Sequence, residues 1–472
     1  MEKRNLTRRQ FLKASATGLS FMYLPGIGRV KAQPFDLFDS LDTFGRLCYN
    51  ENPLGPSPLA LEAMKHAAQE GNRYPEWFSP ALEAAIAEHH DVNSNMICAG
   101  AGATEMIRLI ADAFLYAGDE MITATPTYSQ MASEAVANGA SVVHVPVDGD
   151  YIIDLGLIRD AVSANTRLIS LVNPNNPLPT VFTKADMEAF MDWLPASITV
   201  VVDEAYHNYV HSTEYESCIR YVTQGRPLIV IRTFSKIYGL AGVRIGYTVA
   251  SSGYTSMIQS TQNIGMVSTL GQAAAAAALN DTQHVTDTVA LNDQAKEILS
   301  AGFNALGLDY IPSETNFMMF DTGTNASAVA AQLALRGFQV RVGWGMPQHI
   351  RVSTGTIEEM EKFIAALGDI LGQGLSGGGS SVFGFNRVFP SPFRQQCTIR
   401  ISTQGDEHVR LVIYDVSGRK IRALVSGALA PGTHDIVWDG KDIHGRNAAV
   451  GNYMVHLMQG ELAASARVTL VR

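Results

Sequence analysis

The feature that most constrains the fold is an alternation of short β-branched runs with longer alanine-rich segments, which extends from about residue 41 to residue 371. Such an alternation is typical of βα units, in which helices cover a mostly parallel sheet. Polar and apolar residues do not alternate along these runs, as expected for strands that are buried on both faces. They span residues 121–123, 142–145, 168–172, 198–202 and 228–231. We therefore expect an α/β fold whose ligands bind beyond the carboxyl ends of these strands.

Length and composition limit the classes of protein that need to be considered. With 472 residues, of which 46% are hydrophobic and 17% charged, the chain can bury a large core and should form two or three domains. A net charge of −10 argues against a nucleic-acid partner. The four cysteines lie far apart and form no CxxC pair, so we expect no metal site and no dense disulfide framework. No apolar run reaches the roughly 18 to 20 residues of a transmembrane helix.

The first 32 residues have the order of an export signal. Residues 7–13 (TRRQFLK) precede a mildly apolar stretch over residues 14–27, and residues 30–32 (VKA) end on a small side chain. This order resembles a twin-arginine signal, which implies export to the periplasm, the cell surface or the medium. The alternative is an amphipathic helix with two chance arginines. We exclude residues 1–32 from the fold.

A change of composition near residue 372 predicts a domain boundary. Residues 372–381 are almost entirely glycine and serine, and we expect a flexible linker over residues 372–388. Beyond it, polar and apolar residues alternate in short stretches that are separated by turn clusters. These stretches are residues 398–401, 409–414 and 453–457. The pattern predicts a small antiparallel β-sandwich over residues 389–472.

The segment with the most chemical information is residues 232–247 (RTFSKIYGLAGVRIGY), directly after a predicted strand. Judged alone, Lys236 would be a solvated loop residue. Hydroxyls, small residues and an arginine surround it, however, namely Thr233, Ser235, Gly239, Gly242 and Arg244. An enzyme that uses pyridoxal phosphate (PLP) needs a lysine as covalent anchor, hydroxyls and an arginine for the phosphate, and small residues for close backbone approach. We therefore predict that Lys236 carries PLP and also serves as the general acid and base.

Residues 200–206 (VVVDEAY) place an acid at the end of a buried strand. Judged alone, Asp203 would be a helix N-cap or a loop acid. Beside the Lys236 segment, its carboxylate suits the pyridine nitrogen of PLP, because it keeps that nitrogen protonated and the ring electron-withdrawing. Tyr206 is predicted to hydrogen-bond the hydroxyl oxygen of the ring.

Three further segments complete the predicted cofactor pocket. Residues 100–105 (GAGATE) open a helix, and the N–H groups near Ala103 and Thr104 could hold the phosphate. Tyr128 could lie on the pyridine face, and Asn176 could donate to the ring oxygen. The commoner structures for these segments are a plain glycine-rich loop, a core tyrosine and a proline-rich turn.

In this order and spacing, the segments resemble fold-type-I PLP enzymes, and most closely the histidinol-phosphate aminotransferase family. The resemblance covers about residues 41–371 and includes residues 50–58 (NENPLGPSP), 73–75 (RYP) and 350–356 (IRVSTGT). It implies a seven-stranded, mostly parallel sheet in a large domain and a small α+β domain.

Within a PLP domain of residues 33–371, the large domain should cover about residues 73–280. The small domain should combine residues 33–72 with residues 281–371. The resemblance also implies a homodimer, in which Tyr74 reaches the cofactor phosphate of the neighbouring subunit.

The substrate side follows from the same resemblance. Arg351 should take the acidic end of the substrate, with help from Arg341, whereas by itself Arg351 would be a solvated charge. Two departures fall on this side. Leu178-Pro179-Thr180 stands where the family usually has Thr-Gly after Asn-Asn-Pro, and Val342 stands where it usually has aspartate.

These features together predict an aminotransferase with ping-pong kinetics. It would move an amino group between an amino acid or amino phosphate, such as histidinol phosphate, and a 2-oxo acid. The alternative that keeps the cofactor is a decarboxylase of a phosphorylated amino acid, which would release carbon dioxide and leave no amine on PLP. A non-catalytic exported scaffold is a third hypothesis, and it predicts loss of the catalytic residues, which are all present.

The C-terminal part resembles the FlgD-type immunoglobulin-like modules of exported bacterial proteins. The resemblance rests on residues 389–393 (FPSPF), 412–419 (VIYDVSGR), 437–440 (VWDG) and 468–472 (VTLVR). It implies a sorting or attachment tail with a partner in the cell envelope or the secretion machinery. The alternative is a stabilising appendage without a separate role.

Overall fold

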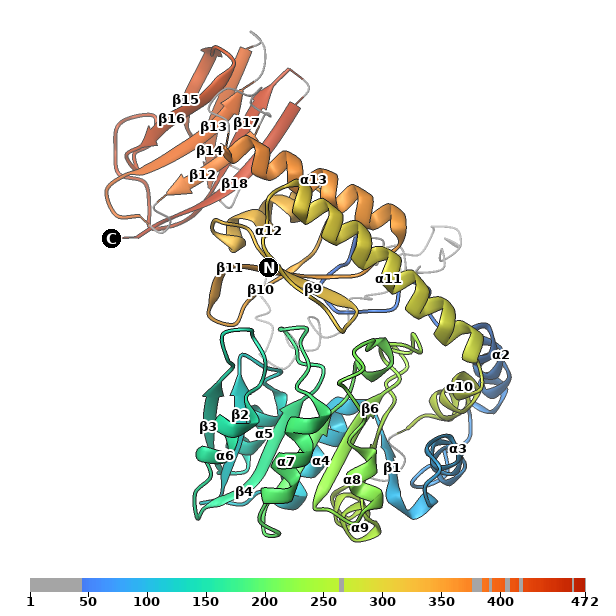
Figure 1. The fold of residues 1–472 in the computed structure, drawn as a ribbon. Coiled ribbons are helices and arrows are strands. Elements are labelled where there is room, and N and C mark those ends of the chain that lie inside the picture. Colours follow the sequence, from blue (N-terminus) through green and yellow to red (C-terminus); the bar gives the residue numbers. More distant parts are fainter. Residues whose placement is uncertain are drawn as a thin grey trace, which may run out of the picture. The chain divides into compact units, whose positions relative to one another are not determined.

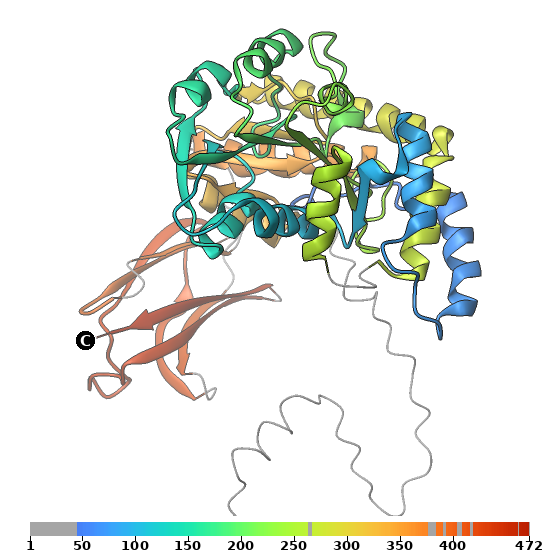
Figure 2. The same cartoon turned by 90° about the horizontal axis from the view of Figure 1, so that it is seen from below.

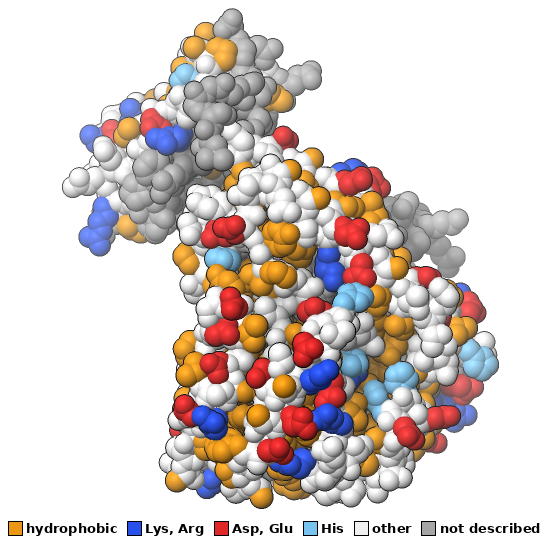
Figure 3. Space-filling model, in the orientation of Figure 1, with side chains coloured by type: hydrophobic (Ala, Val, Ile, Leu, Met, Phe, Trp, Pro, Cys, Tyr) orange, Lys and Arg blue, Asp and Glu red, His pale blue; other side chains and the backbone are white. Residues whose placement is uncertain are grey.

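The computed structural model describes residues 45–262, 267–375, 384–389, 393–403, 408–415, 419–460 and 462–471 (Figure 1). The expected export signal, residues 1–32, lies outside these residues. No helix among the described residues is both long enough and apolar enough to cross a membrane. Acidic and basic side chains are interspersed over the described part of the face in Figure 3.

Seven strands form the large sheet, in the order β1-β7-β6-β5-β4-β2-β3. Their bounds are β1 Ile97–Gly100, β2 Glu120–Thr125, β3 Ser141–Pro146, β4 Thr166–Val172, β5 Thr199–Asp203, β6 Leu228–Thr233 and β7 Gly246–Val249. From β3 through β2, β4 and β5 to β6 the neighbours are parallel, and β7 is antiparallel to both of its neighbours. The mostly parallel sheet that the sequence predicts is confirmed.

Successive strand residues enter two cores, one on each face of the sheet. On β5, Val200 and Val202 belong to one core and Val201 to the other, because side chains alternate across a strand. The helices that supply the first core include α3 Pro80–His90, α6 Leu155–Asp160, α7 Lys184–Trp193, α8 Ile219–Thr223 and α10 Thr269–Leu279. Those that supply the second are α4 Ala103–Phe114, α5 Gln130–Ala137 and α9 Ser252–Thr261. Figure 2 shows the sheet between these two layers.

One expected strand is not buried on both faces. In β3 only Val145 is buried, while Val142 and Val143 are half-buried. The reason is the position of β3 at the edge of the sheet, where it pairs with β2 alone. The sequence expectation of full burial is wrong for this strand.

The small domain has a four-stranded antiparallel sheet in the order β10-β11-β9-β8. Its elements are α11 Thr282–Ala305, β8 Tyr310–Ile311, β9 Phe317–Asp321, α12 Ala326–Leu335, β10 Arg341–Gly343, β11 Met346–Ser353 and α13 Ile357–Leu375. Phe303, Leu333 and Phe363 join the helices to the sheet in one core. The N-terminal segment packs on this domain, because the Ser353 N–H donates to the Leu47 carbonyl at 2.9 Å.

Helix α2 (Pro58–Ala67) lies with the large domain, whereas the boundary expected at residue 72 puts it in the small one. It packs against α10, and Ala60 enters the core of the large sheet. Figure 1 shows α2 and α10 side by side. The chain therefore crosses from the small to the large domain before α2, and residues 45–57 form the crossing.

The C-terminal region contains two antiparallel sheets, in the orders β12-β13-β16 and β15-β14-β17-β18. The strands are β12 Gly384–Phe389, β13 Cys397–Thr403, β14 His408–Asp415, β15 Lys420–Ala428, β16 Gly432–Trp438, β17 Gly451–Gln459 and β18 Leu462–Leu470. Trp438 is fully buried between Phe393 and Tyr453, at ring distances of 5.3 and 5.0 Å. This confirms the predicted all-β sandwich.

The glycine-rich linker is shorter than residues 372–388. Helix α13 continues to Leu375, since its apolar face packs on the small-domain core through Ile370 and Leu371. Strand β12 begins at Gly384, where it pairs with Ser402 of β13. Both ends of the expected linker are therefore regular structure, and residues 376–383 lie outside the described residues.

Candidate active site

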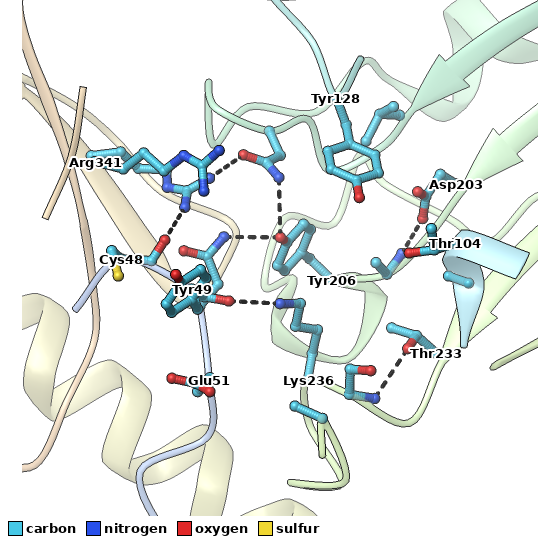
Figure 4. Close-up of a pocket in the computed structure, with 18 of the residues that line it drawn as sticks. Cys48, Tyr49, Glu51, Thr104, Tyr128, Asp203, Tyr206, Thr233, Lys236 and Arg341 are labelled. Carbon is cyan, nitrogen blue, oxygen red and sulfur yellow. Dashed lines mark hydrogen bonds between the residues drawn. The ribbon is translucent and has the colours of Figure 1, made fainter. Parts of the chain in front are cut away.

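A cavity of about 450 Å³ lies at the carboxyl ends of β4, β5 and β6 (Figure 4). Every site residue predicted from the sequence except Tyr74 lines it. These residues are Ala103, Thr104, Tyr128, Asn176, Asp203, Tyr206, Thr233, Ser235, Lys236, Arg244, Arg341 and Arg351. The N-terminal segment adds Cys48, Tyr49, Asn50 and Glu51. The large domain, the small domain and the crossing segment thus all contribute to one site.

Lys236 follows β6, and its amine donates to the Tyr49 carbonyl at 2.9 Å. Burial is the main cause that lowers the pKa of this amine to about 8, and the nearby cation of Arg351 lowers it as well. A neutral fraction of the amine is therefore available near neutral pH, which nucleophilic and base chemistry both need. In the turn after Lys236, the backbone at Gly239 packs closely against Gly55. No side chain would fit there, because a Cβ atom on Gly239 would lie only 1.9 Å from the Gly55 carbonyl oxygen.

An anion cradle lies at the start of α4. A Cβ on Gly102 would lie 2.5 Å from Arg244 Nη2, and a Cβ on Gly246 would lie 2.4 Å from the Ala103 nitrogen. These glycines let Arg244 and the first N–H groups of α4 approach one point. The first N–H groups of a helix have no intrahelical acceptor and favour anions. With the Ser235 hydroxyl, 3.5 Å from Arg244 Nη1, this donor set fits the PLP phosphate.

The Thr233 hydroxyl makes two contacts within the turn that follows β6, and its expected contact to the cofactor phosphate remains a prediction. It accepts the Ser235 N–H at 3.1 Å and donates to the Ile245 carbonyl at 3.4 Å. Thr233 lines the cavity, but its hydroxyl fixes the turn that presents Ser235 and Lys236. The sequence could not distinguish a phosphate contact from this turn contact, because both need a hydroxyl at that position.

A buried acid also lines the cavity. Asp203 ends β5 and is 7% exposed, and burial raises its pKa to about 6. Its Oδ1 accepts the Ala205 N–H at 3.0 Å. Figure 4 shows Tyr128 and Asp203 on one side of Tyr206 and Arg341 on the other. A protonated pyridine nitrogen would supply the cation that this carboxylate needs, so the acid fits PLP as well.

The substrate side is built around Arg351, which is only 5% exposed. Its Nη1 donates to Asn176 Oδ1, and its Nη2 donates to the Cys48 carbonyl at 2.7 Å. The guanidinium carbon lies 5.1 Å from the Phe317 ring and 5.3 Å from the Trp344 ring. Its Nε has no hydrogen-bond partner among the described residues. Burial lowers the pKa of Arg351 to about 10, so the group remains a cation that can accept an acidic ligand.

Arg341 and Arg351 face each other in the register of β10 and β11. Arg341 is exposed, whereas Arg351 is buried, so the two cations lie at different depths.

Trp344 was not identified from the sequence. It lies in the β10–β11 turn with φ +59° between two glycines that also have positive φ. Left-handed backbone is rare for a bulky residue and points to a functional constraint. The Gly-Trp-Gly sequence was the available signal. Trp344 packs on the cluster of Leu178, Ile311 and Met319, so the residue that departs from the family at position 178 supports a wall of the substrate side.

A buried ion pair fastens the strand ends behind the cavity and was also missed. Arg232 Nη2 lies 2.7 Å from Glu204 Oε2, and both side chains are at most 8% exposed. Arg232 also donates to the Ser217 hydroxyl at 2.8 Å. Glu204 follows Asp203, and Arg232 precedes Thr233, so the pair ties β5 and β6 together directly next to site residues.

Tyr74 lies outside the cavity and is 99% exposed. Its expected contact to the cofactor phosphate of a neighbouring subunit remains a prediction.

A lysine with a lowered pKa, an anion cradle and a buried acid around one cavity are the groups that a PLP enzyme of fold type I requires. The aminotransferase class I and II family model matches residues 44–367, and the FlgD Ig-like domain model matches residues 394–460. The chain belongs to the class I and II aminotransferase family, and it is a PLP-dependent transaminase.

Relatives and solved structures agree with this assignment. The histidinol-phosphate aminotransferase of Symbiobacterium thermophilum is 40% identical over 332 residues, which cover 70% of this chain and 91% of the relative. That of Moorella thermoacetica is 37% identical over 329 residues, or 69% and 85% of the two chains. The crystal structure of histidinol-phosphate aminotransferase from Sinorhizobium meliloti in complex with pyridoxal-5'-phosphate has a TM-score of 0.67 and 29% identity, and the match covers 70% and 92% of the two chains.

Asp203→Asn should stabilise the PLP-free protein and weaken PLP binding. Because burial raises the pKa of Asp203 from 3.8 to about 6 in the folded state, the wild type loses stability as the pH rises through this range. The amide cannot ionise and can still accept the Ala205 N–H. We expect the free energy of unfolding to rise by on the order of 2 kcal/mol at pH 8, with the gain vanishing toward pH 4. Urea unfolding at both pH values, and titration with PLP, measure the two effects. A variant no more stable than the wild type at pH 8 would contradict this account.

Proposed function

We propose that this transaminase takes its amino group from a donor with an acidic end and passes it to a 2-oxo acid. The donor is an amino acid or an amino phosphate of the histidinol-phosphate kind. The observation that carries the proposal is the buried Arg351, which lines the same cavity as Lys236. A guanidinium binds carboxylates and phosphates through its N–H edge. The names of the relatives support the amino phosphate.

We assign the cofactor contacts from the geometry above. Bound PLP withdraws electrons from the substrate α-carbon. Lys236 would hold it covalently, and Arg244, Ser235 and the N–H groups of Ala103 and Thr104 would hold its phosphate. Asp203 would pair with the pyridine nitrogen, Tyr206 and Asn176 would hydrogen-bond the ring oxygen, and Tyr128 would cover the ring.

Lys236 acts a second time once the donor amine has replaced it. The freed amine takes the proton from the donor α-carbon, which a neutral amine can do because its pKa is near 8. The Tyr49 carbonyl, 2.9 Å from Nζ, keeps the amine in the cavity. Arg351 holds the acidic end of the donor, which fixes the direction of the α-proton relative to Lys236.

We further propose a homodimer. Several exposed apolar and aromatic side chains in the first part of the chain support it, namely Leu54, Tyr74, Trp77 and Phe78. In such a dimer, Tyr74 would reach the cofactor phosphate of the other subunit.

We also propose export through the twin-arginine route to the periplasm, the cell surface or the medium. Residues 7–13 support the route, and the FlgD Ig-like match supports a cell-envelope or secretion partner for the C-terminal domain.

Lys236→Ala should abolish amino transfer, with a loss of at least about 10²-fold to 10⁴-fold because the general base is removed. The PLP-loaded protein without residues 1–32 would be mixed with a panel of amino acids and amino phosphates plus a 2-oxo acid. Product amine and carbon dioxide would both be measured. Lys65→Ala is the matched control, since Lys65 is exposed on α2. Turnover by Lys236→Ala would overturn the assignment, and carbon dioxide release without amine transfer would establish a decarboxylase instead.

Arg351→Lys should lower kcat/KM by about 10²-fold for donors with an acidic end. The lysine ammonium keeps the positive charge but lacks the paired N–H donors of the guanidinium. Donors without an acidic end should be affected much less. Arg341→Lys is the comparison, and its effect should be smaller because Arg341 is exposed. The measurement is steady-state kinetics of each variant with pairs of donors that differ only in the acidic end. Equal losses for both kinds of donor would exclude Arg351 as the site for the acidic end.

Replacing both Arg8 and Arg9 by lysine should keep the protein in the cytoplasmic fraction, since twin-arginine export requires the arginine pair rather than its charge. Fractionation and immunoblotting measure this. Exchange of Lys3 and Arg4 for arginine and lysine is the control with the same total charge. Unchanged export of the double-lysine variant would exclude this route.

A further inference from the structure

Asn50 lies in the crossing segment with a left-handed backbone, at φ +56°, and is 1% exposed. Asparagine and aspartate tolerate this conformation better than other residues with a side chain. A residue keeps it inside a protein where its surroundings hold it in place. Asn50 also lines the cavity next to Lys236 and Tyr206.

Four hydrogen bonds hold Asn50. Its N–H donates to Ser353 Oγ at 2.8 Å, and Ser353 Oγ donates to its Oδ1 at 2.9 Å. Asn316 Nδ2 donates to its carbonyl at 3.0 Å. Its own Nδ2 donates to the Tyr206 hydroxyl at 2.9 Å. The first three bonds come from the small domain, and the fourth reaches the large domain.

The orientation of the Asn50 amide follows from the same contacts. Ser353 is 1% exposed, and its hydroxyl already accepts the Asn50 N–H. Its proton therefore needs an acceptor, and Asn50 Oδ1 is the acceptor that the described residues provide. A flipped amide would leave this buried proton unpaired. Nδ2 is thus the atom that faces Tyr206.

The Tyr206 oxygen accepts two hydrogen bonds, from Asn50 Nδ2 at 2.9 Å and from Asn176 Nδ2 at 3.3 Å. A phenol oxygen offers two lone pairs and one proton. With both lone pairs occupied by amide donors, the proton is directed away from both amides. Figure 4 shows both bonds converging on the Tyr206 oxygen.

We propose that Asn50 is a positioning residue that fixes Tyr206 as a hydrogen-bond donor toward the PLP ring oxygen and connects this donor to β11. Ser353 lies two residues beyond Arg351 on β11. The strand that holds the substrate acid is therefore joined, through Ser353 and Asn50, to the side chain that tunes the cofactor. The inference rests on the proposed role of Tyr206.

Asn50→Gly tests the inference without changing charge. Glycine accepts the positive φ and keeps the backbone contacts to Ser353 and Asn316, but it removes the donor to Tyr206. A ring oxygen that receives a weaker hydrogen bond is more basic. The proton that it shares with the Lys236-bound nitrogen should therefore leave at higher pH. We expect the pH midpoint of the visible absorbance of the PLP-loaded protein to rise by roughly one unit.

Asn50→Asp is the second variant. It keeps the tolerance for positive φ and the acceptor for Ser353, but it would accept the Tyr206 proton instead of donating. The midpoint should rise further, partly because of its added charge. Both variants would be measured again in combination with Tyr206→Phe. This separates the effect of the lost hydrogen bond to Tyr206 from the effect of the added charge. The charged groups around Tyr206 and Lys236, namely Asp203, Glu51, Arg244 and Arg351, stay unchanged throughout.

The double-variant comparison decides. The shift caused by Asn50→Gly should disappear in the Tyr206→Phe background, and thermal unfolding of the PLP-free proteins checks that each variant folds. A shift that persists without the Tyr206 hydroxyl, or no shift at all, overturns the inference. Absence of a Lys236-dependent absorbance band in the wild type would instead refute the proposed cofactor role. The two failures are therefore distinguishable.

Discussion

The parallel pairing of β4, β5 and β6 is the constraint on which the active site depends. Val172 pairs with Asp203, and Asp203 pairs with Ile231, so three strands end at one edge of the sheet. Asp203 at the end of β5 consequently meets Asn176 and Lys236, which follow β4 and β6, in one cavity. Peptide N–H and C=O groups at strand ends lose ladder partners, and the buried pair of Glu204 and Arg232 fastens these ends. The position of the acid and of the lysine is thus set by backbone pairing before any cofactor binds.

Charge balance explains why this cavity favours anions. Lys236, Arg244, Arg341 and Arg351 line it, against Asp203 and Glu51. Burial and the neighbouring cation of Arg351 both favour the neutral form of Lys236. A phosphate dianion at Arg244 and an acidic group at Arg351 would reduce this excess of positive charge.

Local sequence patterns predicted much of the fold and of the cofactor side of the site. They did not predict features that depend on contacts between residues far apart in the chain. The strands and the residues at their ends could be identified because β-branched runs and the chemistry that follows them are adjacent in the chain. The role of Asn50 could not, since its partner Ser353 is 303 positions away. The same holds for α2, whose place depends on contact with α10, and for Trp344, whose indole meets Arg351 only through a turn of unusual backbone.

The two halves of the site also differ in how much the family resemblance explains. The cofactor side keeps the pattern of the family, as the matching residues around Lys236 and Asp203 indicate. The departure at Leu178 is fully buried in the cluster on which Trp344 packs, beside Arg351. Leu178 and Trp344 thus form an apolar wall next to the Arg351 guanidinium, whose carbon lies 5.3 Å from the Trp344 ring. Electrostatic attraction is stronger where water is excluded, so the wall should make the acidic end of the donor a stricter requirement while it restricts the shape of the rest of the molecule.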